Sequence, residues 1–121
     1  MRNISFFKTT QQIIDRTKTV TRRNGWRFLR VGDRLCAVEK TQGLKAGEKI
    51  MKLGIIEVVE LRWEPLNTIT QKDVVLEGFP DKDPAWFIGL YLSMYPRMRP
   101  ADLVHRIEFS YVEGLAQGVL L

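Results

Sequence analysis

Cysteine and histidine are nearly absent from this sequence, which has 121 residues, one cysteine and one histidine. A single thiol, Cys36, excludes an internal disulfide and is typical of a reducing compartment. One cysteine and one histidine are also too few to form a structural zinc site. Glycine-rich phosphate-binding loops of the Walker or GxGxxG type are missing. These absences predict a protein with no metal ion and no cofactor.

Long apolar segments are missing as well. No run approaches the roughly 18 apolar residues that a membrane-spanning helix needs. The apolar part of the opening "MRNISFFKTT" is too short for the core of a signal peptide. With the lone thiol, this predicts a soluble cytoplasmic protein that has no membrane partner. Neither a repeat nor a linker divides the chain, so we predict a single domain over residues 1–121 and favour a monomer.

Basic residues exceed acidic ones. The chain has 19 Lys and Arg against 14 Asp and Glu, which gives a net charge of +5 and a sequence pI near 9.6. A basic small domain favours a polyanionic partner such as RNA. Charge by itself is not a motif, because many basic domains of this size bind no nucleic acid.

Turn signals and alternating apolar residues divide the chain into five or six strands and two or three short helices. We predict strands near residues 4–7, 18–23, 34–40, 50–63 and 103–112, and helices at Thr9–Arg16, Thr70–Glu77 and Pro84–Tyr95. Thr70 and Asp83 are the expected N-caps of the last two helices. Tight turns without a repeated β-α unit predict an α+β fold, a small, mostly antiparallel β-barrel with the helices packed outside it.

Three features of these elements need an interpretation. In the strand at 50–63 the odd positions are apolar except Glu57, and Gly54 marks a possible bulge, so we expect Glu57 to reach solvent. His105 shares a strand face with apolar residues and is expected to be a hydrogen-bonded core residue. The aromatic stripe of the last helix is interpreted as core packing.

The segment "RTKTVTRR", residues 16–23, places a lysine, threonines and arginines around a single apolar residue. Thr21 is a nucleophile if a base accepts its proton, and Lys18 can be that base where burial and neighbouring cations lower its pKa. Glu77, at the end of a predicted helix, can protonate a leaving amine. Lys18 and Thr21 meet only if the chain bends at the start of the strand. The alternative is a solvated basic edge strand that resists edge pairing.

The K-x-x-T-x-R pattern formed by Lys18, Thr21 and Arg23 resembles the core motif of the ASCH family, the activating-signal-cointegrator homology domains. The likeness continues with "GW", with "GD" at Gly32-Asp33, with the "EG" that closes the Thr70 helix, and with the final "HRIEF". It covers residues 4–112. One departure is Arg16, because the family usually has glycine two residues before the lysine.

The resemblance implies a PUA-like β-barrel whose cleft binds RNA or a modified nucleobase. One branch of the family removes the acyl group from N4-acetylcytidine with Lys, Thr and Glu, which fall on Lys18, Thr21 and Glu77. A few members cleave RNA. For this chain the resemblance leaves open a basic binding cleft, an N4-acylcytidine amidohydrolase, and a ribonuclease or non-catalytic adaptor. Arg22, Arg23 and Trp26 are the predicted ligand-binding residues, and Trp26 is a stacking platform or a core or rim aromatic.

Overall fold

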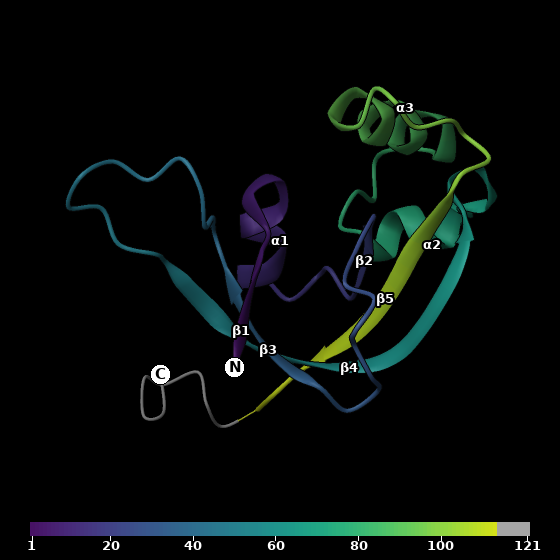
Figure 1. The fold of residues 1–121 in the computed structure, drawn as a ribbon. Helices are drawn as coiled ribbons and strands as arrows, with labels where there is room; N and C mark the ends of the chain where they lie inside the picture. The colour runs from purple at the N-terminus through teal and green to yellow at the C-terminus, as the bar shows by residue number, and fades with distance from the viewer. Residues whose placement is uncertain (114–121) are drawn as a thin grey trace.

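One five-stranded sheet forms the centre of the molecule (Figure 1). The computed structural model describes residues 1–113. In spatial order the strands are β1 (Arg2–Ser5), β3 (Arg34–Val38), β4 (Lys52–Pro65), β5 (Leu103–Tyr111) and β2 (Val20–Arg23). The β1–β3 pair is parallel and the other three pairs are antiparallel. The sheet is therefore a mixed half-barrel with β1 and β2 at its two edges, which confirms the predicted α+β, mostly antiparallel fold.

The helices are short and lie above the arc of β4 and β5 in Figure 1. The structure has the α-helices α1 (Thr10–Ile14), α2 (Gln71–Leu76) and α3 (Pro84–Met94), and the 3-10 turns η1 (Phe7–Thr9) and η2 (Leu66–Thr68). The first helix ends two residues earlier than predicted, because Arg16 has a left-handed backbone with a φ of 62°. Helical hydrogen bonding cannot continue through such a residue.

The predicted caps of α2 and α3 are confirmed. The Thr70 side chain accepts a hydrogen bond from the backbone of Asp73, and that of Asp83 accepts one from the backbone of Trp86. Gly78 ends α2 with a φ of 105°. A Cβ atom at this position would lie 2.8 Å from Cγ of Gln12, so both the backbone and the space require glycine. The segment after α2 is thereby held against α1.

The predicted odd-numbered apolar face of β4 reaches the main core at Leu53 and Leu61 but not between them. The bulge expected at Gly54 is present, because the register with β3 shifts between Ala37 and Val38. Ile56 and Val58, at even positions, are fully buried in the main core, whereas Val59 is exposed. The register with β5 shifts between Val58 and Glu60, so Val59 is an extra, bulged residue. After this bulge the odd position 61 faces the core, because a one-residue insertion moves the following side chains to the opposite face. As predicted, Glu57 is partly exposed, and it pairs with Arg34.

Two apolar clusters hold the sheet and helices together. The main core lies within the half-barrel and joins β1, β3, β4 and β5 to α1 through residues such as Ile4, Phe6 and Phe109. A second cluster joins α2 and α3 to the end of β4 and to β5, with Val74, Phe87 and other buried residues at its centre. The two cores leave space between them, beside the free edge of β2.

Candidate functional site

A cavity of about 280 Å³ lies along the free edge of β2. Residues of η1, β2, α2 and α3 line it. Lys18, Thr21, Arg22, Arg23 and Glu77 all contribute to its wall. Because β2 is an edge strand, side chains from both of its faces reach the cavity. Five of the six residues that the sequence predicted for the site therefore lie around one space.

Lys18 and Glu77 form a buried ion pair at this cavity. The Lys18 Nζ atom donates to Glu77 Oε1 at 2.8 Å and to the Glu77 backbone carbonyl at 2.7 Å. The two side chains are 4% and 2% exposed. Burial lowers the pKa of Lys18 below its usual range, the Glu77 carboxylate opposes this shift, and the Arg23 and Arg22 charges add to it. Lys18 therefore loses its proton more readily than a surface lysine does.

The bend that brings Lys18 to this position is made by Arg16. Its φ of 62° is the left-handed conformation that glycine adopts most easily, so the tight turn is present although the family's glycine is not. The Arg16 side chain is held by an ion pair with Glu113 and lies over the ring of Tyr111. The backbone N–H of Lys18 then donates to the carbonyl of Gln12, which turns the chain from α1 into β2.

Thr21 and Arg23 are the next residues of the cavity wall. The Thr21 Oγ1 atom accepts a hydrogen bond from Arg23 Nε at 3.0 Å, and Arg23 Nη2 donates to the Ser5 carbonyl at 2.7 Å. This second bond spans the opening between the two edge strands, β1 and β2. Within the described residues Thr21 makes no side-chain hydrogen bond to Lys18, so its hydroxyl proton is available to a bound molecule.

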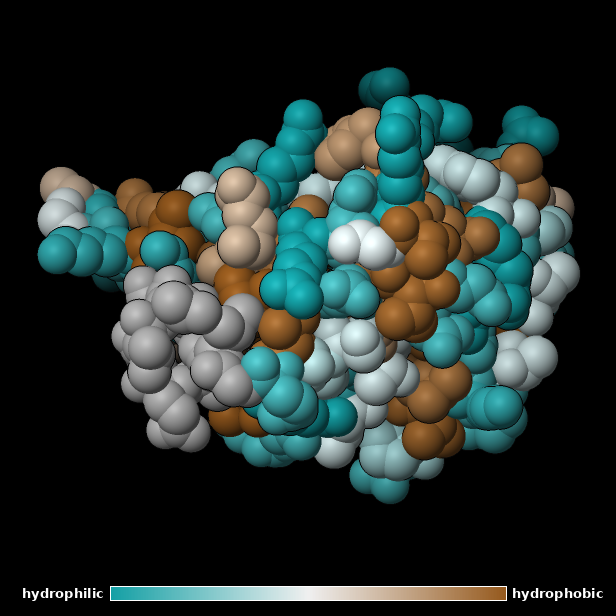
Figure 2. All heavy atoms as spheres, turned by 90° about the horizontal axis from the view of Figure 1, so that it is seen from below, coloured by the Kyte–Doolittle hydropathy of each residue, from teal (hydrophilic) through white to brown (hydrophobic). Residues whose placement is uncertain are grey.

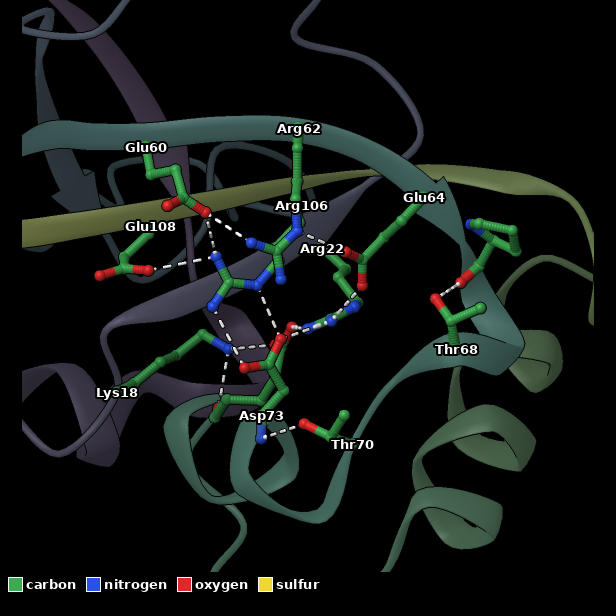
Figure 3. A network of polar contacts seen from close by, with 12 residues as sticks. Lys18, Arg22, Glu60, Arg62, Glu64, Thr68, Thr70, Asp73, Arg106 and Glu108 are labelled. Atoms are coloured by element: carbon green, nitrogen blue, oxygen red, sulfur yellow. Dashed lines mark hydrogen bonds and ion pairs between the residues drawn. The ribbon is translucent and has the colours of Figure 1, made fainter.

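Three arginines lie side by side across the sheet. Arg22 on β2 is paired in register with Arg106 on β5, and Arg106 with Arg62 on β4. Like charges in such positions repel one another. Asp73 of α2 lies between the first two, where its Oδ2 atom accepts from Arg22 at 2.6 Å and from Arg106 at 2.7 Å (Figure 3). This carboxylate makes the close approach of two buried guanidinium groups possible.

Arg22 is the most heavily paired residue of this cluster. Its Nη2 atom also donates to Glu64 at 2.8 Å, and its Nη1 atom donates to Glu77 at 2.9 Å. Its side chain is fully buried, and its Nε atom has no partner among residues 1–113. Arg22 is therefore paired with three carboxylates, and one of them, Glu77, is also the partner of Lys18. The buried cations of the predicted basic cleft are thus paired, whereas Arg23 and Lys8 line the cavity without an ion pair to any carboxylate of the described residues.

The electrostatics of Asp73 give a pH prediction. Burial by itself would raise the pKa of Asp73, but hydrogen bonds and charges from Arg106 and Arg22 outweigh it and lower the pKa from 3.8 to about 2. A carboxyl with a lowered folded pKa stabilises the fold above its unfolded pKa. We expect this stabilisation to be lost as pH falls from about 4 to about 2. Urea unfolding at a series of pH values measures it. An Asp73→Asn variant with the same pH dependence as the wild type would contradict the assignment.

Helix α3 closes the cavity on the side opposite to β2. Phe87, Leu90, Tyr91 and Met94 line it, together with Tyr95 at the end of the helix. The aromatic stripe predicted as core packing is therefore shared: Phe87 and Tyr91 are buried, while Met94 is 39% exposed and faces the cavity. The Tyr91 hydroxyl donates to Asn24 at 2.6 Å, and burial raises the pKa of Tyr91 well above its usual range.

The sixth predicted site residue, Trp26, does not line this cavity. It packs partly buried against the main core and lies 5.4 Å from the ring of Phe28. His105 is buried as predicted, with its Nδ1 atom 3.1 Å from the carbonyl of Gly25 and its ring stacked on Trp63 at 4.4 Å. Neither Trp26 nor His105 contributes to the cavity wall.

Sequence reasoning missed the supporting side chains of the site. Asp73 was recognised only as a capping residue, and Arg106 and Glu64 were not singled out. One signal was present in the sequence. The alternation of β5 places Arg106 on the face opposite to Ile107, and an arginine that is buried there needs carboxylate partners. Which carboxylates reach it depends on how α2 packs onto the sheet.

No group of three His, Cys, Asp or Glu side chains within residues 1–113 is arranged to hold a metal ion. In the same part of the chain, no helix has the length and apolar character needed to span a membrane.

Comparisons with known proteins bear on the fold. No family model matches the chain, and no curated protein matches its sequence. The structure is similar to the crystal structure of an ASCH domain from Lactobacillus crispatus JV V101, with a TM-score of 0.69 and 16% sequence identity, over 91% of this chain and 78% of that one. It is also similar to a protein of Enterococcus faecalis V583 from the DUF984 family, with a TM-score of 0.60 and 17% identity, over 87% and 67% of the two chains. The fold implied by the K-x-x-T-x-R motif is thereby confirmed, and this chain folds as an ASCH domain.

Proposed function

We propose that the cavity beside β2 binds a single nucleobase, either in a modified nucleoside or in an RNA. The observation that carries this proposal is the contrast between the two cavity walls. One wall is aromatic and apolar, with Phe87, Leu90 and Tyr91, and the other presents Thr21 and Arg23. A nucleobase has apolar faces and a polar edge, so it matches both walls at once.

The charge of the site supports a neutral ligand group inside the cavity. The two buried cations, Lys18 and Arg22, are paired with carboxylates, which leaves Arg23 and the exposed Lys8 as the unpaired cations of the wall. The Thr21 hydroxyl and the Arg23 guanidinium remain as donors toward a carbonyl oxygen or a ring nitrogen. The cavity volume of about 280 Å³ is just below the roughly 300–1,000 Å³ of typical ligand sites, which suits a small ligand group.

Filling the cavity provides the test. Leu90 lines it and is partly buried, so Leu90→Trp should occupy ligand space and weaken binding of N4-acetylcytidine and cytidine by about tenfold or more, which corresponds to at least 1.4 kcal/mol. Val75→Trp is the control, because Val75 is 40% exposed on α2 and does not line the cavity. Titration calorimetry measures both. No nucleoside binding by the wild type, or equal affinities of the two variants, would contradict the proposal.

A second candidate function is hydrolysis of an N4-acylated cytidine. The observation that favours it is the presence of Lys18, Thr21 and Glu77 around one cavity, with the pKa of Lys18 lowered by burial. In this reaction Lys18 acts as the base and Glu77, whose Oε1 atom lies 2.8 Å from Lys18 Nζ, acts as the proton donor.

The reaction would then proceed in two steps. Thr21 Oγ1 attacks the acyl carbonyl while its proton goes to Lys18, and the C–N bond breaks as Glu77 protonates the leaving amino group of cytosine. Water then hydrolyses the acyl-threonine ester and releases the carboxylic acid. The Arg23 Nε–H holds Thr21 Oγ1 on the cavity side of β2.

A further inference from the structure

A second surface, separate from the cavity, is formed by the loop that joins β2 to β3. Its backbone is fixed at several points: Leu29 is buried in the main core, and the N–H of Gly32 donates to the carbonyl of Val58. On either side of Leu29, the side chains of Arg27, Phe28 and Arg30 are exposed. In Figure 1 the loop passes beneath β4 and β5, on the side away from the helices.

Two arginines of this surface lie on aromatic rings. The Arg2 guanidinium is 3.8 Å from the ring centre of Phe28, and that of Arg27 is 4.7 Å from the ring centre of Trp63. Phe28 is 49% exposed and Trp63 is 36% exposed. A guanidinium held over a ring keeps its charge and N–H donors, which can bind phosphate oxygens.

The charges here are not neutralised, in contrast to those of the buried cations beside the cavity. Arg2, Arg27 and Arg30 form no ion pair with any carboxylate of residues 1–113. Arg22 and Arg106, by contrast, are both surrounded by acidic groups. Figure 2, seen from below, shows hydrophobic and strongly hydrophilic side chains mixed on this face of the molecule. Positive charge is therefore available beside exposed aromatic rings, and this combination fits a flexible chain of phosphates and bases.

We propose that the loop surface of Arg2, Arg27, Phe28, Arg30 and Trp63 binds single-stranded RNA. The arginines hold backbone phosphates, and the exposed face of Phe28 stacks on a base. No residue of this surface lines the cavity, so the two binding sites are formed by different residues. An acidic protein or an anionic membrane would use the charges but would not need the ring of Phe28.

The test is fluorescence anisotropy with a labelled oligouridylate of about 12 nucleotides, a length within the site sizes of single-strand binders. Arg27→Gln with Arg30→Gln should remove two phosphate contacts, which lowers the affinity and reduces the slope of log affinity against log salt by about 1.4. Phe28→Ala should weaken binding roughly 5- to 150-fold, the range of one lost base stack. The control is Arg97→Gln with Arg99→Gln, which removes the same charge from exposed positions beyond α3.

The outcomes separate this proposal from the function proposed for the cavity. The loop variants should bind N4-acetylcytidine as the wild type does, because none of the substituted residues touches the cavity. Equal weakening by the Arg97 and Arg99 control would show that general charge binds the RNA and would overturn the proposal. So would an unchanged affinity of Phe28→Ala, or equal binding of the wild type to phosphatidylserine vesicles and to the oligonucleotide.

Discussion

Replacing Arg22 with methionine is expected to destabilise the fold by about 3–5 kcal/mol, the cost of breaking a buried ion pair by removing one partner. Its guanidinium is fully buried and donates to Asp73, Glu64 and Glu77. Without Arg22, each of these carboxylates keeps one cationic partner, and each remains largely buried. The partners are Arg106 for Asp73, Arg62 for Glu64 and Lys18 for Glu77. The side chain of methionine fills a similar volume, so the loss measures charge pairing and not a cavity. Urea denaturation at neutral pH measures the difference in the free energy of unfolding.

Arg62 is the matched control for this substitution. It lies in the same row of arginines and binds two of the same kind of partner, Glu60 and Glu64, but its side chain is 49% exposed. Exposed ion pairs contribute about 0–1 kcal/mol, so Arg62→Met should change stability by no more than that. If Arg22→Met costs as little as Arg62→Met, the buried cluster does not stabilise the fold.

Thr21→Val should abolish deacylation of N4-acetylcytidine if the cavity is an amidohydrolase site. The change is nearly isosteric and removes only the hydroxyl that attacks the acyl group. Lys18→Met should reduce the rate as severely, because removing one member of a group of cooperating catalytic residues costs nearly as much as removing the whole group. Glu77→Gln removes the acid and should slow the reaction by about 10²–10⁴-fold. The rates of all three variants are measured as the release of free cytidine, which is detected by chromatography.

Thr19→Val is the control, since Thr19 lies two residues from Thr21 and does not line the cavity. It should keep the wild-type rate. Thermal unfolding of each variant separates loss of catalysis from loss of fold, which matters for Glu77→Gln because Lys18 then lacks its carboxylate. Full activity of Thr21→Val would show that Glu77 activates a water molecule and that Thr21 is not the nucleophile. No turnover by the wild type would leave the cavity as a binding site.

Local signals made much of the fold predictable. The caps Thr70 and Asp83 and the stop at Gly78 depend on residues within one turn of the helix, so the sequence contains all the information. The motif around Lys18 indicated a bend and a shared cleft with Glu77, and the structure places both residues around one cavity. His105 was placed in the core by simple alternation of β5.

Features that depend on distant contacts were not predictable. The buried face of β4 changes at Val59 because the strand has one extra residue relative to β5. Val59 is not a glycine, so its residue type did not indicate a bulge. The pairing of the buried arginines beside the cavity arises because α2 carries Asp73 between two arginines from different strands. Composition indicated only that the protein is basic, and it could not show which cations are paired internally.

The position of β5 in the sheet determines when the cavity can form during synthesis. It is the last of the described strands to leave the ribosome, yet it lies between β4 and β2. Strand β2, which carries Thr21 and Arg23, is made early but pairs only with β5 among the described strands. About 80 residues therefore separate the synthesis of this cavity wall from that of its partner strand, a non-local pairing of the kind that slows folding. The nascent chain can assemble β1, β3 and β4 first, and the ligand site is completed only after Tyr111 has emerged.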